Sequence, residues 1–396
     1  MKWEIAKLGD ISKNIQTGPF GSQLHQSDYS ECGIPVVMPK DLVGGKISEE
    51  SIARVDKTHV ERLCRHKIEV GDILYSRRGD VGRCAHVTKK EEGWLCGTGC
   101  LRVTIDSEKA DSRFVFFQLQ HPDTIGWVEK HAVGATMLNL NTTILSSVPI
   151  RLPALEIQKR IADILSAYDD LIENNQKQIK LLEEAARRLY KEWFVDLRFP
   201  GHENTKIVDG VPEGWNEKTL SQVANVIMGQ SPKSEFYNSE KKGLPFHQGV
   251  GSYGVRFVID DIYSTSYTRI AEPNSILFSV RAPVGRLNIT KNKVVIGRGL
   301  AAINQTDGCQ SYLYYLLKNK FFKDNIVGNG SIFASVSKDE LLNQKFLIPE
   351  RNLMMQFEKI VSQMDKQIEN LDSKNKKLIE ARDRLLPKLM SGEVEV

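Results

Sequence analysis

Arginine side chains stand in two turn-like segments of the 396-residue chain. The segment 77–80 reads RRGD, and the segment 281–283, in the other half of the chain, reads RAP. Glycine and proline mark both as turns, and turns lie at the surface because their backbone needs solvent or special dihedral angles. An exposed arginine can donate a bidentate pair of hydrogen bonds to the edge of a guanine base, whereas lysine or serine can bind a phosphate. These segments indicate nucleic-acid contact, and the alternative for any single arginine is a solvated surface charge.

Other loops carry the same kinds of side chain but differ between the two halves of the chain. The second half has PFHQGVGSYGVRF (245–257) and IYSTSYTRI (262–270), while the first half has VVMPKDLVGGKI (36–47). Two halves with different polar loops could read two different ligand surfaces. The candidate nucleic-acid contacts are Lys40, Arg77, Arg78, Arg83, Ser252, Tyr253, Arg256, Arg281, Arg286 and Arg298.

The cysteines raise the alternative of a zinc site. They form the pairs Cys64-x-His66, Cys84-x-His86 and Cys96-x3-Cys100. None of these pairs has the Cys-x2-Cys spacing of ordinary structural zinc sites. In an internal repeat, set out below, Leu287 and Leu300 stand opposite Cys84 and Cys100. We therefore favour small apolar positions on buried strands over a metal site.

Signatures of catalysis are missing from the sequence. It has no Gly-x4-Gly-Lys-Ser/Thr loop for nucleotide phosphates. It also lacks Asn/Asp-Pro-Pro-Tyr/Phe, the adenine-methyltransferase signature, and contains no Pro-Pro dipeptide at all. Pro122-Asp123 is the only Pro-Asp pair, and no Glu-x-Lys follows closely enough to suggest a nuclease. We expect a chain that is not itself catalytic and binds neither cofactor nor metal.

Composition sets the outer limits of the architecture. The length predicts two or three domains, and 41% hydrophobic residues supply cores for all of them. A net charge of +4 is compatible with a nucleic-acid partner but does not require one. No stretch approaches the roughly 18 apolar residues of a membrane span. We expect a soluble, cytoplasmic protein.

The elements that must position the candidate residues include a long helix, predicted over 158–194. Its apolar residues return at spacings of three and four, and no glycine or proline interrupts them. The predicted seam is Ile161, Ile164, Tyr168, Leu171, Leu182, Ala185 and Leu189. At about 1.5 Å per residue the helix would be roughly 55 Å long, which is longer than a small domain is wide. Such a helix joins domains rather than filling one.

A second copy of this helix is predicted over 356–390. Asp169-x-x-Ile172-Glu173-Asn174 aligns with Asp365-x-x-Ile368-Glu369-Asn370 at an offset of 196 residues (365 − 169), and the offset holds without a gap. One helix seldom buries such a stripe alone, so we expect the two copies to pack on each other. The alternative is two unrelated amphipathic helices, each lying on its own domain.

The repeat extends into the segments before each helix. The segments 71–83 and 274–286 share Ile-Leu-aromatic-Ser followed by Val-Gly-Arg, and Gly97-x-Gly99 is answered by Gly297-x-Gly299. Short β-branched runs such as IPVVM and LRVTI predict strands, and the aromatic segments near Phe116 and Tyr314 predict helices. Each half is thus a globular domain of mixed helix and sheet followed by a long helix.

We therefore predict an α+β fold with two pseudo-symmetric mixed α/β domains and two long helices that pair as an antiparallel coiled coil. The expected boundaries are residues 1–154 for the first domain, 155–195 for the central helix, 196–213 for a linker, 214–350 for the second domain, 351–390 for the C-terminal helix and 391–396 for a tail. Before the long helices, Asn141 is a predicted helix N-cap, and Ser337 with Glu340 a predicted capping box.

Taken together, these features resemble a known family. The duplicated domain and helix, the passage GATMLNLN…SVPIRLP…EIQKRIADIL (134–165) and EWFVDLRFPG (192–201) are similar to the DNA-specificity subunit of type I restriction-modification systems, over essentially the whole chain. The resemblance implies two target-recognition domains for a split site in double-stranded DNA, with the helices as spacer. It also implies two methyltransferase subunits that bind S-adenosylmethionine, and ATP-dependent restriction subunits, as partners.

Symmetry supports the same expectation. Two related domain-helix units that run their helices antiparallel would meet duplex DNA in opposite orientations, as a dimer meets two half-sites. Because the halves differ, the site should be asymmetric, and helix length would act as a ruler at about 3.4 Å per base pair. Two other functions stay open at this point: an enzyme with an active site in the globular halves, and a purely structural coiled-coil protein.

Overall fold

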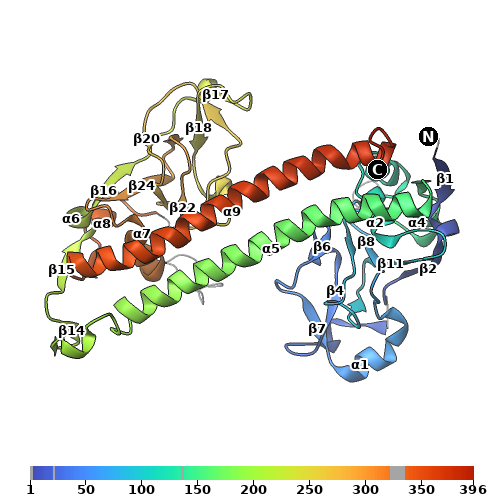
Figure 1. Ribbon diagram of the computed structural model, residues 1–396, viewed down its shortest axis with the longest axis horizontal. Helices are drawn as coiled ribbons and strands as arrows, with labels where there is room; N and C mark the ends of the chain where they lie inside the picture. The colour runs from blue at the N-terminus through green and yellow to red at the C-terminus, as the bar shows by residue number, and fades with distance from the viewer. Residues whose placement is uncertain (1–2, 21–22, 135–137, 322–334) are drawn as a thin grey trace. The chain divides into compact units, whose positions relative to one another are not determined.

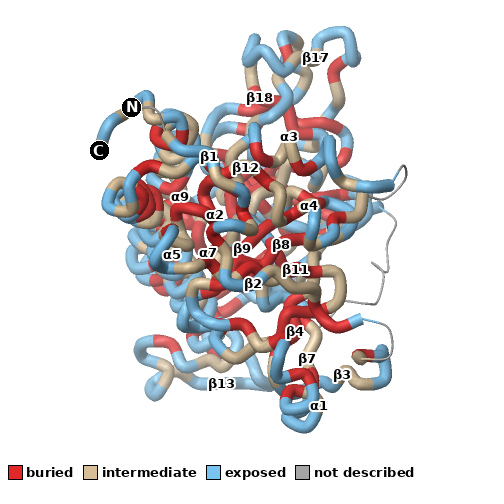
Figure 2. The backbone as a smooth tube through the Cα atoms, turned by 90° about the vertical axis from the view of Figure 1, so that its right-hand side faces the viewer, coloured by how far each residue is buried: buried red, intermediate tan, exposed pale blue. Residues whose placement is uncertain are grey.

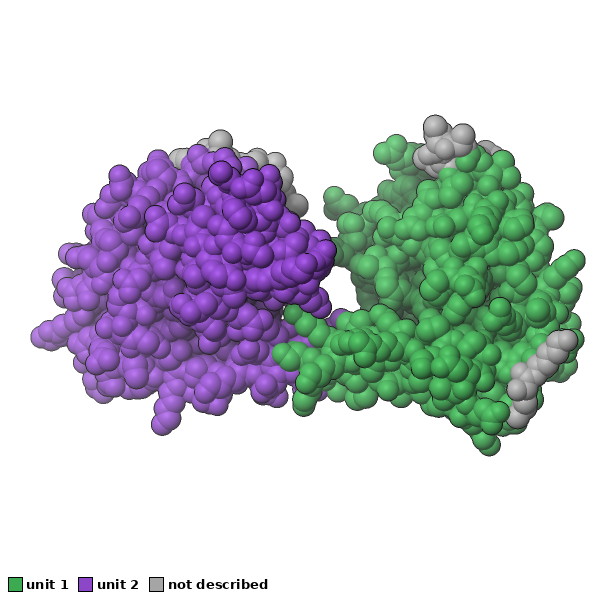
Figure 3. Space-filling view, turned by 90° about the horizontal axis from the view of Figure 1, so that it is seen from above, with its two compact units in different colours: residues 1–175, 373–396 green, residues 176–372 purple. Residues whose placement is uncertain are grey.

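A computed structural model describes residues 3–20, 23–134, 138–321 and 335–396 of the chain. They form two compact units, shown in different colours in Figure 3. Unit 1 contains residues 1–175 and 373–396, and unit 2 contains residues 176–372. Two long helices, α5 (Leu155–Phe194) and α9 (Arg351–Ser391), each contribute one part to unit 1 and the other part to unit 2.

Unit 1 contains two four-stranded sheets and two short strand pairs. The first sheet is antiparallel, in the order β2 (Ser12–Thr17), β11 (Cys100–Ile105), β8 (Ile73–Ser76) and β9 (Cys84–His86). The second has the order β10 (Leu95–Cys96), β4 (Ile34–Val37), β7 (Ala53–Val55) and β3 (Tyr29–Ser30), with β10 parallel to β4. Strand β1 (Glu4–Lys7) pairs with β12 (Pro149–Leu152), and β5 (Leu42–Val43) with β6 (Lys46–Ile47).

The core of unit 1 lies between its first sheet and its helices. These helices are α2 (Ser112–Leu119), α3 (Pro122–His131) and α4 (Thr142–Ser146), whereas α1 (Lys57–Arg62) packs through Val60 on the second sheet. Figure 2 shows buried residues along β8, β9 and β11. Tyr75 and Phe114 are fully buried there, and Ile161 of α5 and Leu389 of α9 belong to the same cluster. The long helices are therefore part of the domain core and not only a connection.

Unit 2 repeats the arrangement. Its first sheet has the order β16 (Ala224–Met228), β24 (Leu300–Gln305), β21 (Ile276–Ser279) and β22 (Leu287–Ile289). Its second has the order β17 (Tyr237–Asn238), β19 (Tyr263–Ser264), β18 (Leu244–His247), β23 (Val294–Ile296) and β20 (Ile270–Ala271), with β18 parallel to β23. Strand β15 (Asn216–Thr219) pairs with β25 (Lys345–Ile348), and the short helices are α6 (Leu220–Val223), α7 (Gln310–Phe321) and α8 (Lys338–Leu342).

The segment between α5 and β15 has structure of its own. It contains the strand pair β13 (Ile207–Val208) and β14 (Val211–Pro212). Phe199 is buried in the core of unit 2, where its ring lies 5.5 Å from that of Trp215. This part of the chain is therefore packed against the second domain.

The two long helices run antiparallel in both units, as Figure 1 allows the reader to follow. In unit 1 the Asn175 side chain donates to that of Asn375 at 2.8 Å, and Arg382 donates to Asp169 at 2.6 Å. The residue number thus rises along α5 while it falls along α9. In unit 2 the Tyr190 ring packs 5.9 Å from that of Phe357. The predicted α+β class, with two mixed domains and paired long helices, is confirmed.

Individual seam positions were predicted less well. Leu171 and Ala185 of the predicted seam are exposed, and the next residues along the helix, Ile172 and Ala186, are buried instead. A straight α-helix drifts by about 20° per heptad relative to a strict seven-residue repeat. Helix α5 also packs against the domains as well as against α9, so its buried face is wider than a coiled-coil seam. Both predicted caps are confirmed: Asn141 caps α4, and Ser337 with Glu340 forms a capping box on α8.

Candidate nucleic-acid interface

Three turns of unit 2 are tied together by backbone hydrogen bonds. The Gly297 amide donates to the carbonyl oxygen of His247, the last residue of β18, at 2.8 Å. The Val280 amide, directly after β21, donates to the carbonyl oxygen of Gly299 at 2.9 Å. The turns after β18 and β21 therefore meet the turn before β24, and we call this place the turn junction of unit 2.

Unit 1 has the same junction. The Gly97 amide donates to the carbonyl oxygen of Val37, at the end of β4, at 2.9 Å. The Arg77 amide, directly after β8, donates to the carbonyl oxygen of Gly99 at 2.7 Å. Lys40 lies in the 3₁₀ turn Pro39–Asp41 that follows β4. The junction thus brings together turns that are far apart in sequence, and in unit 1 the turns after β4 and β8 carry predicted contact residues.

Most of the predicted contact residues are exposed on these turns. They are Lys40, Arg78, Arg83, Arg281, Arg286 and Arg298. Two of them are engaged within unit 1: Lys40 donates to the Ser51 carbonyl oxygen at 3.0 Å, and Arg83 donates to Asp80 at 2.7 Å. Arg77 is half-buried, with its Nε atom enclosed. All seven stay predictions.

Arg281 and Arg298 line one open cavity at the junction of unit 2. Its volume is about 190 Å³, and Gln248, Val250 and Ser279 also line it. Neither arginine forms an ion pair with any residue that the structure describes. Two guanidinium groups and an amide at one cavity can bind a base edge or a phosphate, because both ligands present acceptors to N–H groups.

Arg256 was predicted to contact nucleic acid, and this prediction is wrong. Its side chain is only 2% exposed. It forms ion pairs with Asp365 of α9 and, at 3.3 Å, with Glu183 of α5. Its guanidinium carbon lies 4.6 Å from the centre of the Tyr314 ring. Arg256 therefore holds the loop after β18 on the long helices, and its position in the sequence gave no sign of this.

The burial of Arg256 and Asp365 also affects their pKa values. Burial raises the pKa of Asp365 above its ordinary value, and the facing Arg256 opposes this shift. Burial alone would lower the pKa of Arg256, but the tyrosines and Asp365 around it raise that pKa instead. Arg256 is therefore a permanent charge that makes an ionised carboxylate tolerable inside unit 2.

Tyr253 and Ser252 also face inward with their polar atoms. The Tyr253 hydroxyl is enclosed, and burial raises its pKa, while the residue as a whole is half-buried and stays a predicted contact. The Ser252 hydroxyl shares a 2.8 Å hydrogen bond with Nδ1 of buried His247, and His247 Nε2 lies 3.1 Å from Asp260. These contacts fix the loop after β18, while Ser252 itself stays a predicted contact.

Comparisons with known proteins now bear on this geometry. The family model for the type I restriction modification DNA specificity domain matches residues 1–184 and again residues 212–381. The chain belongs to this family. Its two matches include both turn junctions. Members of the family recognise DNA and are not catalytic, which confirms the expected absence of enzyme activity on the basis of family.

Relatives of this chain align with it over nearly its whole length. A Methanocaldococcus jannaschii protein with the provisional name of type I restriction enzyme MjaX specificity subunit is 29% identical over 405 residues, covering 100% of this chain and 94% of the relative. The type I restriction enzyme HindI specificity subunit of Haemophilus influenzae is 24% identical, with 99% of each covered. The crystal structure of a type I restriction-modification S subunit from M. genitalium has the same fold, with a TM-score of 0.64 at 18% identity over 98% of this chain and 96% of that one.

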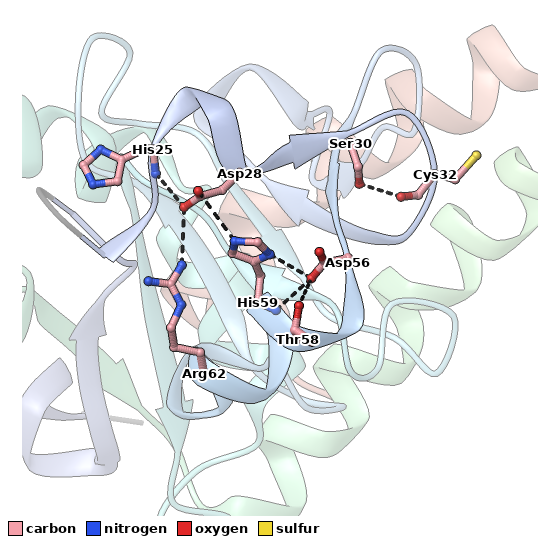
Figure 4. A network of polar contacts seen from close by, with 8 residues as sticks. All are labelled: His25, Asp28, Ser30, Cys32, Asp56, Thr58, His59 and Arg62. Carbon is pink, nitrogen blue, oxygen red and sulfur yellow. Dashed lines mark hydrogen bonds and ion pairs between the residues drawn. The ribbon is translucent and has the colours of Figure 1, made fainter.

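Unit 1 carries a polar network that sequence reasoning missed (Figure 4). His59 of α1 lies between Asp56, 2.7 Å from its Nδ1, and Asp28, 3.5 Å from its Nε2. Arg62 also reaches Asp28, at 3.3 Å. The backbone N–H of His25 is the main cause that lowers the pKa of Asp28. The network holds α1 against the segment 25–30. In unit 2 the chain passes from β19 to β20 without a helix of this kind.

Cys84 and Cys100 lie as the repeat predicted, whereas Cys32 and Cys64 are exposed. Cys84 on β9 and Cys100 on β11 are buried, and burial raises the pKa of the Cys84 thiol to about 12. Within the described ranges, no three side chains of His, Cys, Asp or Glu are grouped as metal ligands. The same part of the chain has no helix that is both long and apolar enough to cross a membrane.

Proposed function

We propose that this chain is the specificity subunit of a type I restriction-modification complex, in which each globular half reads one part of a split, asymmetric DNA site. The observation that carries the proposal is the turn junction, which occurs twice with the same backbone hydrogen bonds but different side chains. Gln248 and Arg298 of unit 2 stand where unit 1 has Met38 and Thr98. One scaffold with different exposed groups would bind two different base sequences.

We further propose that the helices act as the spacer. Helix α5 has 40 residues and α9 has 41, and they run antiparallel in both units. In this proposal residues 1–154 and 214–350 are the target-recognition domains, 155–195 and 351–390 the spacer helices, 196–213 the linker and 391–396 the tail. An α-helix rises about 1.5 Å per residue and B-DNA about 3.4 Å per base pair, so adding residues to both helices should widen the gap.

The proposed partners supply the chemistry that this chain lacks. They are two DNA methyltransferase subunits that carry S-adenosylmethionine, and restriction subunits that use ATP, acting together on DNA in the cytoplasm. The relatives' names support this, because each is called the specificity subunit of a restriction enzyme. The chain would bring these subunits to a DNA sequence and would hold no cofactor itself.

Mapping of modified adenines in a genome tests the proposal. Cells that express this chain with its companion methyltransferase would be compared with cells that lack only this chain. The expected result is a split motif with one fixed gap that disappears without the chain. Modification that persists unchanged would place specificity elsewhere and overturn the proposal.

Two altered chains test its separate parts. Exchanging the region before Pro153 for that of another family member should change one half-site and leave the other unchanged. Lengthening α5 and α9 by matched numbers of residues should widen the gap and leave both half-site sequences as they were. Altered half-site sequences at an unchanged gap would contradict the spacer role.

A further inference from the structure

The residue between the two glycines of each turn junction stands on a fixed backbone. In unit 2 the flanking glycines bond to β18 and to the residue after β21, and in unit 1 to the end of β4 and the residue after β8. A further bond closes each turn: the Leu300 amide donates to Gly297 at 3.0 Å, and the Cys100 amide donates to Gly97 at 3.2 Å. The central residue is therefore presented in the same way in both units.

One flanking glycine of each turn has no room for a side chain. A Cβ atom at Gly97 would lie 2.6 Å from the Val37 carbonyl oxygen, and one at Gly299 would lie 2.4 Å from the Gln248 carbonyl oxygen. Both distances are shorter than real Cβ contacts, and the atoms they meet are backbone atoms that cannot turn away. The central side chain is thus the part of this turn that can change without moving the junction.

The central side chains differ in length and exposure. Thr98 is half-buried, and its hydroxyl donates to the Pro19 carbonyl oxygen at 2.7 Å. Arg298 is exposed, its amide donates to the Ser231 hydroxyl at 3.2 Å, and its side chain lines the cavity that Arg281 also lines. Unit 1 therefore has a short side chain, Thr98, that bonds to the protein at this position, whereas unit 2 has the exposed guanidinium group of Arg298.

We infer that the residue at positions 98 and 298 is a specificity-determining residue, and that Arg298, beside Arg281, reads a guanine edge in the half-site bound by unit 2. The inference rests on the proposed function and says which side chain gives the two halves different targets. A guanidinium fork matches the O6 and N7 acceptors of guanine in the major groove. A threonine held to its own backbone leaves that position in unit 1 without such a fork.

A phosphate contact is the competing role for Arg298, and the repeat argues against it. Phosphates are the same at every DNA site, so a phosphate contact on a shared backbone would be the same in both units. Bases differ between half-sites, and the side chain differs here while the turn does not. A fixed backbone beneath the side chain also favours a base contact, because a bidentate hydrogen bond needs a defined geometry.

The test compares Arg298→Lys and Arg298→Thr with the unaltered chain in the complete methyltransferase complex. Modified motifs and binding to duplexes with single-base changes would be measured. Lysine keeps the charge but loses the fork, so both variants should lose discrimination at one guanine of one half-site, by about 5- to 150-fold, with the other half-site unchanged. Lys293→Thr is the matched control, because Lys293 belongs to unit 2 but pairs with Glu272 at 3.1 Å and does not line the cavity.

The reciprocal variant Thr98→Arg should add a guanine preference to the other half-site. The inference is overturned if Arg298→Lys keeps the motif and the discrimination of the unaltered chain. It is also overturned if Arg298→Thr weakens binding equally on all duplexes, which marks a phosphate contact. If instead the unaltered chain directs no split motif, the proposed function itself fails, and this result is seen before any variant is made.

Discussion

Replacing Arg256 by methionine should destabilise unit 2 by about 3 kcal/mol. Removing one partner of a buried ion pair costs about 3 to 5 kcal/mol, because the remaining charge is left without compensation. The lower end applies here, since the side chains of Asp365 and Glu183 are 21% and 20% exposed and water relieves part of the charge. For a unit of this size, about 3 kcal/mol lowers Tm by roughly 6 to 12 °C. Methionine keeps an apolar stem against the Tyr314 ring, so the loss reports the charge.

The loss should depend on pH. Burial raises the pKa of Asp365 in the folded chain above its ordinary 3.8, and without Arg256 that pKa rises further. A carboxyl group with a raised folded pKa binds its proton more tightly when folded, so the stability lost at neutral pH returns as pH falls through the folded pKa. Arginine does not titrate in this range. The difference between the two chains should therefore shrink as pH falls from neutral through the raised pKa of Asp365.

Thermal and denaturant unfolding, followed for unit 2 by amide hydrogen exchange, measures these effects. Arg188→Met is the matched control, because the Arg188 side chain is 76% exposed and its pair with Glu184 lies at the surface, where water screens the attraction. The double variant Arg256→Met with Asp365→Leu should recover most of the loss, since it leaves no charge buried. A single variant within about 1 kcal/mol of the unaltered chain, or a loss that does not change with pH, would refute the reasoning.

Three further changes probe other parts of the chain. Replacing both Asn175 and Asn375 by leucine should stabilise the helix pair but relax its register, so the mapped motif would show more than one gap; a single unchanged gap would contradict this. Gly229→Ala should cost about 1 to 3 kcal/mol in thermal unfolding, because its Cβ would lie 2.1 Å from a backbone oxygen, whereas Gly249→Ala, with open space around it, should be neutral. Arg78→Ala should weaken one half-site only, by about 1 to 3 kcal/mol if it forks a guanine, while an equal loss on all DNA would mark a phosphate contact.

The internal repeat made much of the architecture predictable from sequence. The offset of 196 residues placed two long helices in register and required a partner for each apolar stripe. The same repeat identified the two Gly-x-Gly turns and predicted that Cys84 and Cys100 occupy buried apolar positions. These inferences succeed because helix period, turn residues and duplicated segments are local patterns, and a local pattern needs no knowledge of distant contacts.

The sequence did not show which loop charges face solvent. Arg256 and Arg281 both stand in polar loops, yet Arg256 is buried and Arg281 is exposed. The difference comes from Asp365, which lies 109 residues from Arg256 along the chain and meets it only after α9 packs on the domain. The sequence also did not show which face of α5 is buried, since Ile172 rather than Leu171 packs inward.

Sequence alone thus determined the duplication, the two helices and the turns that carry the candidate contacts. Tertiary structure decided which of those side chains are exposed to solvent and which hold the domains on the helices. The physical reason is that burial and ion pairing depend on contacts between distant segments, and one charged side chain has the same local pattern whether it meets a base or a buried carboxylate.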